Sequence, residues 1–266
     1  MHDAHLDAGL MWFRRDLRLQ DNVALAHALR ACRRVFAVFV FDTDILDDLP
    51  RADRRVAFIH QSLLELDQTL RAHGAPGSGL IVLHGRASAE IPRLAQALGV
   101  QAVFTNHDYE PVALQRDALV RGALASQGIS LHSFKDQVIF ERDEILTQSG
   151  TPFSVFTPYK NAWLKKLQPF YVSAYPVAHH ASALAPRPAG EVLPSLSDLG
   201  FTATNLHSLK LPTGPAGAQE LLADFLERMD RYHETRDFPA VKGPSYLSMH
   251  LRFGTVSIRE LARQAN

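Results

Sequence analysis

The segment from Tyr232 to Ser248 carries residue types that suit the binding of a phosphate or diphosphate group. Arg236 lies in a loop, and Gly243-Pro244-Ser245 then opens a predicted helix that continues through Ser248. A helix N-terminus presents unpaired N–H groups and a positive dipole, and a guanidinium matches the geometry of phosphate oxygens. The segment therefore predicts a diphosphate-bearing cofactor at this helix start; the alternative is that Ser245 serves only as a helix cap.

Residues 155–167 (VFTPYKNAWLKKL) interleave lysines, Lys160 among them, with phenylalanine, tyrosine and tryptophan. Basic residues contact the phosphates of nucleic acids and aromatic side chains stack on their bases, so the segment is typical of a nucleic-acid contact. The alternative is an amphipathic helix with solvated lysines, in which the aromatic residues, Trp163 in particular, face the core.

A third polar cluster, residues 12–22 (WFRRDLRLQDN), follows the first apolar run of the chain. Two interpretations are compatible with each other. The cluster is an ion-paired turn in which Asp21 or Asn22 caps the next helix, and it is also the polar rim of a ligand cleft.

Several classes of chemistry are excluded by what the chain lacks. The loop from Arg14 to Asn22 has no glycine, and neither a dinucleotide fingerprint nor a P-loop occurs anywhere. The single cysteine, Cys32, excludes a disulfide within the chain and any multi-cysteine metal site. The thirteen histidines form no metal-ligand pattern and no nucleophile elbow occurs, so we expect neither a metal site nor hydrolytic machinery.

The elements that position these clusters follow from the hydrophobic pattern. Five short apolar runs predict strands at Ala8–Phe13, Val35–Phe41, Leu80–Leu83, Ala102–Thr105 and Ile129–His132. The segments between them predict helices at Asn22–Ala31, Arg51–His73, Ala87–Leu98 and Pro111–Gln127. Continuous apolar strands alternating with helices predict an α/β domain over residues 1–135, with a doubly wound, five-stranded parallel sheet. Such sheets bind ligands beyond the C-terminal ends of their strands.

The rest of the chain differs in composition. Residues 136–215 predict an interdomain linker with a connecting helix, because the region 173–219 is rich in proline and has little periodicity. Residues 216–266 predict the truncated start of an all-α domain. Its elements are a helix at Ala216–Arg231, a loop at Tyr232–Gly243, a helix at Ser245–Phe253 ended by Gly254, and a helix at Ser257–Gln264.

The composition is that of an ordinary globular chain. Its 266 residues are 46% hydrophobic and 21% charged, with a formal net charge of zero. No apolar run approaches the ~18 residues that a membrane span needs, and the N-terminus carries no pattern of a secretory signal. We therefore expect no membrane association and a cytoplasmic location.

Three separate parts of the chain resemble landmarks of the DNA photolyase/cryptochrome family. These are residues 12–22 (WFRRDLRLQDN), residues 156–163 (FTPYKNAW), and residues 236–239 (RDFP) together with 247–254 (LSMHLRFG). Their order and spacing agree with the family across essentially all 266 residues.

The resemblance implies a flavoprotein with an antenna chromophore in the α/β domain and FAD in the helical domain. It implies a light-driven lyase that repairs cyclobutane pyrimidine dimers in damaged DNA by electron transfer from excited reduced FAD. The lack of acid–base machinery agrees with this, because a cofactor would carry the chemistry. Cryptochrome-type blue-light signalling and an isolated nucleotide-binding α/β module are the alternatives.

The resemblance also assigns roles to individual residues. Cofactor binding is implied for Tyr232, Ser245, Tyr246, Leu247 and Ser248, and DNA binding for Arg236 and Lys160. Pro244 stands where many members have threonine, so Ser245 and Ser248 would have to make the phosphate contacts. No catalytic residue is implied here, since the rest of the FAD bowl and the tryptophan chain would lie beyond Asn266. We expect a monomer that, as 266 residues alone, binds FAD poorly and repairs nothing.

The resemblance also bears on the identity of the antenna chromophore, through Pro111-Val112-Ala113. Folate-binding members carry asparagine and glutamate at the last two of these positions, and Val112 and Ala113 can make neither hydrogen bond. This argues against a folate antenna and leaves a deazaflavin, another flavin or no antenna as alternatives.

Overall fold

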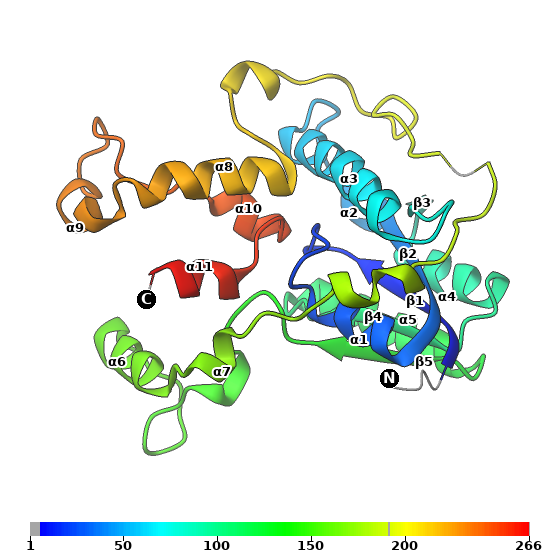
Figure 1. Ribbon diagram of the computed structural model, residues 1–266, viewed down its shortest axis with the longest axis horizontal. Helices are drawn as coiled ribbons and strands as arrows, with labels where there is room; N and C mark the ends of the chain where they lie inside the picture. The colour runs from blue at the N-terminus through cyan, green and yellow to red at the C-terminus, as the bar shows by residue number, and fades with distance from the viewer. Residues whose placement is uncertain (1–5, 191, 266) are drawn as a thin grey trace.

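The structure, a computed structural model, describes residues 6–190 and 192–265. Five parallel strands form one sheet in the order β3-β2-β1-β4-β5 (Figure 1). Their bounds are β1 Leu6–Phe13, β2 Cys32–Asp42, β3 Leu80–Gly85, β4 Ala102–Asn106 and β5 Ser130–Phe134. The predicted five-stranded α/β fold is therefore confirmed. Among the described helices, none combines the length and the apolar composition needed to cross a membrane.

Helices cover both faces of the sheet and enclose two hydrophobic clusters. On one face lie α1 (Val23–Ala31) and α3 (Arg54–His73), and on the other α4 (Ala87–Ala97) and α5 (Pro111–Ala125). The first cluster includes Leu25, Leu29, Phe58, Leu63 and Leu66, and the second Ile91, Leu94, Val120 and Leu124. Because both faces are buried, the strands consist of nearly continuous apolar runs rather than alternating ones.

Side-chain caps set where the helices begin. Asn22 caps α1 by accepting a hydrogen bond from the backbone N–H of Leu25 at 3.1 Å. Of the two predicted capping residues, Asp21 and Asn22, it is therefore Asn22 that caps the helix. Helix α3, predicted from Arg51, begins instead at Arg54, because the Asp53 carboxylate accepts a hydrogen bond from the N–H of Arg55 at 2.7 Å. A short helix, α2 (Thr43–Leu46), follows β2 and was not predicted.

The proline-rich region crosses the surface of the sheet domain. After α6 (Phe156–Lys166) and α7 (Pro169–Val172), the chain passes close to β2, where Leu184 forms a parallel bridge with Val35. Further along, Leu199 and Phe201 are buried in the first hydrophobic cluster. These contacts hold the region, which includes the 3-10 helices Ala178–Ala183 and His207–Leu209, against the α/β domain.

The C-terminal region is helical but is divided differently from the prediction. It contains α8 (Gly214–Leu226), a 3-10 turn (Met229–Arg231), α9 (Tyr232–Thr235), α10 (Ser248–Phe253) and α11 (Ile258–Ala265). The predicted helix to Arg231 ends at Leu226, because Arg228 leaves the helical conformation with φ −135° and ψ 3°. The predicted loop from Tyr232 contains the one-turn helix α9.

The start of α10 is a second correction. The sequence predicts a helix from Ser245, but Tyr246 adopts the left-handed conformation with φ 57°, which interrupts any helix at that residue. The helix therefore begins at Ser248. It ends as predicted at Gly254, whose φ of 61° reverses the chain toward α11.

Candidate functional site

A cavity of about 540 Å³ lies at the C-terminal ends of β1 and β2. This is the edge of the sheet where the sequence predicts a ligand, and the volume is within the range of small-molecule sites. The aromatic side chains of Trp12, Phe39 and Phe41 line it. Apolar residues of α2 and α5 line it as well, and three of them, Ile45, Val112 and Leu119, are exposed.

Two arginines flank the tryptophan of this cleft. The guanidinium of Arg14 lies 4.7 Å and that of Arg116 5.2 Å from the Trp12 ring centre, within range of cation–π attraction. Arg14 Nη1 also donates to Asp117 Oδ1 at 2.5 Å. The loop after β1 is therefore the polar rim of a cleft, as one of its two interpretations predicts.

The cleft also receives residues from the C-terminal region. Arg252 and Phe253, the last two residues of α10, line it. The Glu110 carboxylate accepts from Arg252 Nη1 at 2.5 Å and from Arg15 Nη1 at 3.0 Å. The hydrogen bond from Arg252, together with the nearby charge of Arg15, lowers the pKa of Glu110. This ion network joins α10 to the loop that precedes α5.

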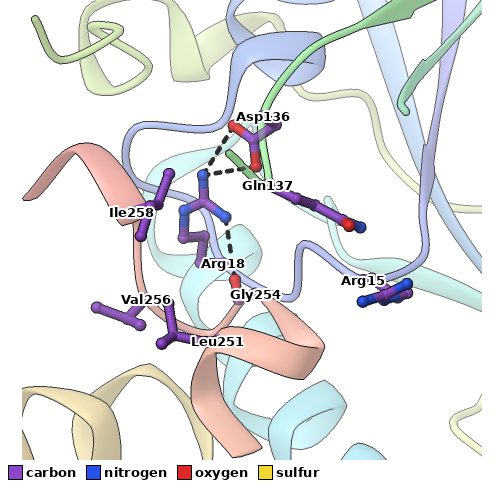
Figure 2. A pocket seen from close by; sticks show the side chains of 8 residues that line it. All are labelled: Arg15, Arg18, Asp136, Gln137, Leu251, Gly254, Val256 and Ile258. Atoms are coloured by element: carbon purple, nitrogen blue, oxygen red, sulfur yellow. Dashed lines mark hydrogen bonds and ion pairs between the residues drawn. The ribbon is translucent and has the colours of Figure 1, made fainter. Parts of the chain in front are cut away.

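The other half of the loop after β1 attaches the helical region to the sheet domain. Figure 2 shows Arg18 between Asp136 and Gly254: Arg18 Nη2 donates to Asp136 Oδ2 at 2.8 Å, and Arg18 Nη1 to the Gly254 carbonyl at 3.1 Å. Arg259 of α11 donates to Asp136 at 2.9 Å and to Asp21 at 3.0 Å. The predicted ion-paired turn is therefore present, and its partners lie more than 100 residues away along the chain.

Asp136 is the centre of this network. The residue is 2% exposed. Burial alone would raise the pKa of its carboxyl group, but Arg18 and Arg259 outweigh that effect and hold the pKa below its usual value. Beside it, Arg18, Gln137 and Val256 line a cavity of about 10 Å³, close to the size of one water molecule (Figure 2). Within the described residues, the buried Oε1 of Gln137 has no hydrogen-bond partner.

The residues predicted to bind the cofactor are Tyr232, at the start of α9, and the consecutive residues 245–248, which lead into α10. Arg228 Nη2 donates to the Pro244 carbonyl at 2.9 Å, which places residues 243–248 beside the turn that leads into α9. Tyr232 is 40% and Tyr246 45% exposed, Ser248 is exposed, Ser245 is half-buried and Leu247 is buried. The side chain of Ser245 does not cap α10: Leu247 is in the cap position and makes no side-chain hydrogen bond there.

Four of these five residues, all except Leu247, carry a hydroxyl group that can donate to a phosphate. Ser248 offers an exposed hydroxyl at the start of α10, and the first turn of that helix has no side-chain cap. None of the five lines the 540 Å³ cleft. The cleft and these residues are therefore two separate places on the molecule, joined by α10.

The residues predicted to contact DNA are both exposed but are not adjacent. Arg236 follows α9 and Lys160 lies on α6, and these two helices lie on either side of α11 in Figure 1. The expectation that Trp163 lies in the core is only partly met, because its side chain is half-buried. Its ring packs edge-on against that of Phe140, with 5.6 Å between the ring centres. Phe156 is 73% exposed, so the aromatic residues of α6 do not all face inward.

Sequence reasoning missed Arg116, Arg252, Asp136 and Arg259. For Arg116 a signal exists: Val112, Gln115, Arg116 and Leu119 share one face of the helix that follows β4. No local signal marks the other three, because their partners are distant in sequence.

His250, on α10, gives the helical region a pH dependence. Its ring is fully buried, Nδ1 lies 2.7 Å from Thr255 Oγ1, and Nε2 has no partner among the described residues. Burial lowers the pKa of His250 from 6.5 to about 4, so the unfolded chain binds a proton more readily than the folded one. Stability is therefore fully present above pH 6.5 and declines as the pH falls toward 4, by about 3 kcal/mol in total.

We expect His250→Asn, which has no titrating group, to lose most of this slope in the free energy of unfolding between pH 7 and pH 4. Denaturant unfolding at several pH values measures it. His84→Asn, at an exposed position, is the matched control and should keep the slope. An unchanged slope in the His250 variant would show that other groups cause the acid destabilisation.

Comparison with known proteins places this geometry in a family. The model of the family described as DNA photolyase matches residues 9–183. A deoxyribodipyrimidine photo-lyase from a Synechococcus species is 36% identical over 264 residues, which cover 97% of this chain and 53% of the relative. The chain spans about half the length of such curated relatives.

Two solved structures share the arrangement. The bacterial class III photolyase from Agrobacterium tumefaciens superposes with a TM-score of 0.83 at 28% identity, over 97% of this chain and 52% of that one. The archaeal photolyase from Sulfolobus tokodaii, described with two FAD molecules, gives 0.69 at 28% identity, over 96% and 54%. The sequence landmarks, the five-stranded sheet and these matches agree, and the chain belongs to the DNA photolyase family.

Proposed function

We propose that this chain is part of a light-driven DNA repair enzyme that splits cyclobutane pyrimidine dimers. In this proposal residues 1–135 form the antenna-binding domain, 136–215 connect it, and 216–266 begin the helical FAD-binding domain. Family membership supports this assignment, as does the position of the five strands within residues 6–134 and of α8 to α11 within 214–265.

The observation that carries the proposal is the position of α10. Its last residues, Arg252 and Phe253, line the cleft, whereas its first, Ser248, lies among the residues proposed to hold the flavin. A helix of six residues is about 9 Å long, so a ligand in the cleft and a flavin at Ser248 would lie close together. A short separation of this kind suits an antenna chromophore and the flavin that it serves.

FAD is the proposed cofactor. When bound, reduced and excited by blue light, it supplies the electron that splits the dimer. The chain positions it: Ser245 and Ser248 offer hydroxyl groups to its phosphates, and Tyr232, Tyr246 and Leu247 complete the proposed site. The protein holds and orients the cofactor rather than supplying an acid or a base.

Damaged DNA is the proposed partner of a monomeric protein. Arg236 and Lys160 are exposed cations that can contact backbone phosphates. A dimer weakens the stacking of its own bases, so a lesion is less costly to extrude from the duplex than an intact pair.

The cleft is the proposed site of a second chromophore. Val112 and Ala113, which stand in place of the polar pair of folate-binding members, both line it. The apolar wall that they form supports a deazaflavin or another flavin rather than a folate. The Sulfolobus tokodaii relative, described with two FAD molecules, is consistent with a flavin there.

The test is light-dependent repair by the protein expressed from its complete reading frame, purified with FAD and reduced. We expect loss of a single thymine dimer from an oligonucleotide under blue light and not in the dark, whereas the 266 residues alone should bind FAD weakly and leave the dimer intact. Arg236→Ala should weaken DNA binding without changing flavin content, and Arg33→Ala, whose side chain is 72% exposed at the far end of β2, should change neither.

Two results would contradict the proposal. A flavoprotein that responds to blue light without removing the dimer would support cryptochrome-type signalling instead. A protein that binds no flavin after reconstitution would support an isolated α/β module.

A further inference from the structure

Arg116 is a mostly buried cation in the wall of the cleft that lacks a close partner. It lies on α5, its side chain is 14% exposed, and it lines the cavity beside Trp12. A guanidinium has five N–H donors, and buried polar groups are nearly always satisfied. Among the described residues, the shortest contact of this guanidinium to an acceptor is 3.4 Å, to Asp117. The group is therefore under-paired for its burial.

The neighbouring carboxylates are already bound to other groups. Asp117 Oδ1 accepts from Arg14 at 2.5 Å, and Arg116 reaches that same oxygen only at 3.4 Å. Asp42 uses Oδ1 for the backbone N–H groups of Asp44 and Ala87, at 3.3 and 3.2 Å, and its Oδ2 lies 3.8 Å from Arg116. Neither carboxylate satisfies the guanidinium.

The electrostatic surroundings agree with this geometry. Burial lowers the pKa of Arg116, and the positive charge of Arg14 lowers it further. An incompletely paired buried charge is costly unless another group approaches it. An acceptor oxygen supplied from the cleft would remove that cost.

The rest of the cleft indicates the shape of the ligand. The exposed apolar side chains of Ile45, Val112 and Leu119 offer an apolar contact surface, and the buried Trp12 ring lines the same cleft. The other cations of the cleft are closely paired, Arg14 with Asp117 and both Arg15 and Arg252 with Glu110. Arg116 is therefore the cation of the cleft with donors to spare.

We propose that Arg116 anchors the ligand of the cleft by donating to an oxygen of a flat heteroaromatic molecule, either a ring carbonyl or a phosphate, whose ring system lies against the apolar wall. This inference rests on the proposed second chromophore and adds the residue that selects it. A ligand without an acceptor oxygen at that end would leave the buried guanidinium unsatisfied, so the site discriminates against it.

The experiment measures binding of FMN and of riboflavin to the purified chain, by quenching of tryptophan fluorescence and by the shift in melting temperature. Trp12 lines the cleft, so a flavin bound there quenches its emission. Arg116→Met keeps an unbranched, flexible side chain and removes the donors. We expect it to raise the dissociation constant roughly tenfold or more. Loss of FMN binding alone identifies a phosphate at Arg116, and loss of both ligands identifies a ring oxygen.

Two controls separate anchoring from a structural role. Arg93→Met removes an exposed arginine of α4 that pairs with Glu90, and should leave flavin binding unchanged. The melting temperature of ligand-free Arg116→Met should equal or exceed that of the wild type, because the substitution removes an under-paired buried charge. A lower melting temperature with unchanged flavin affinity would overturn the proposal and make Arg116 a structural residue.

Ser248→Glu distinguishes the cleft from the proposed FAD site. If this variant weakens FMN binding and Arg116→Met does not, the flavin binds at α10, and the anchor is rejected while FAD binding stands. If the wild-type chain binds neither ligand, both the second chromophore and its anchor are rejected, and repair by the complete protein is still judged by the dimer assay.

Discussion

Replacing Gly254 with alanine is expected to destabilise the protein by several kcal/mol and to weaken flavin binding. Gly254 ends α10 with φ 61°, a conformation that costs a residue with a side chain about 1–2 kcal/mol. It also lies against the loop after β1: a Cβ there would contact the Arg15 carbonyl and come within 2.6 Å of Asp16 Cα. Backbone cannot move aside as a flexible side chain does, so α10 would be displaced from the cleft. Denaturant unfolding measures the loss.

Gly99→Ala is the matched control for this prediction. Gly99 has the same φ of 61°, but a Cβ there would have nothing within 4 Å. The control should therefore show only the cost of the left-handed conformation, about 1–2 kcal/mol. If the two variants lose equal stability, the close approach between α10 and the loop after β1 contributes nothing.

The sheet could be predicted because its strands are covered on both faces. Runs such as Val35–Phe41 and Ala102–Phe104 are apolar without interruption, and each lies inside an observed strand. Helix existence followed in the same way from periodicity. Helix ends did not, since they depend on individual side chains and dihedral angles: Asp53 begins α3, and the left-handed Tyr246 delays α10.

The site was predictable in part for a related reason. The polar loop after β1 stands out because charged residues follow a buried strand, which local sequence shows directly. Its partners do not stand out: Arg252 is 142 residues from Glu110, and Arg259 is 238 from Asp21. Only the tertiary structure divides the loop into a cleft rim, with Arg14 and Arg15, and an attachment point for the helical region, with Arg18 and Asp21.

Removing the carboxylate of Asp136 is the second change with a large expected effect. Asp136 pairs with Arg18 at 2.8 Å and Arg259 at 2.9 Å, and all three side chains are at most 5% exposed. Asp136→Ala leaves two buried guanidinium groups without their shared partner, so we expect the free energy of unfolding to fall by about 3–5 kcal/mol. Flavin binding should weaken as well, because α10 and α11 lose their attachment to the sheet domain. Asp143→Ala, an exposed aspartate of the same connecting region, should be nearly neutral.

A triple variant tests whether the cost comes from lost attraction or from the unpaired cations. Combining Asp136→Leu with Arg18→Met and Arg259→Met replaces the ion network with apolar groups. Replacing a buried ion network in this way often costs a protein little stability. We therefore expect the triple variant to regain most of what Asp136→Ala loses, while the helical region is held less specifically and flavin affinity stays low. If the triple variant is as unstable as the single one, the attraction itself holds the two parts together. If it also regains full flavin affinity, the network has no part in positioning α10.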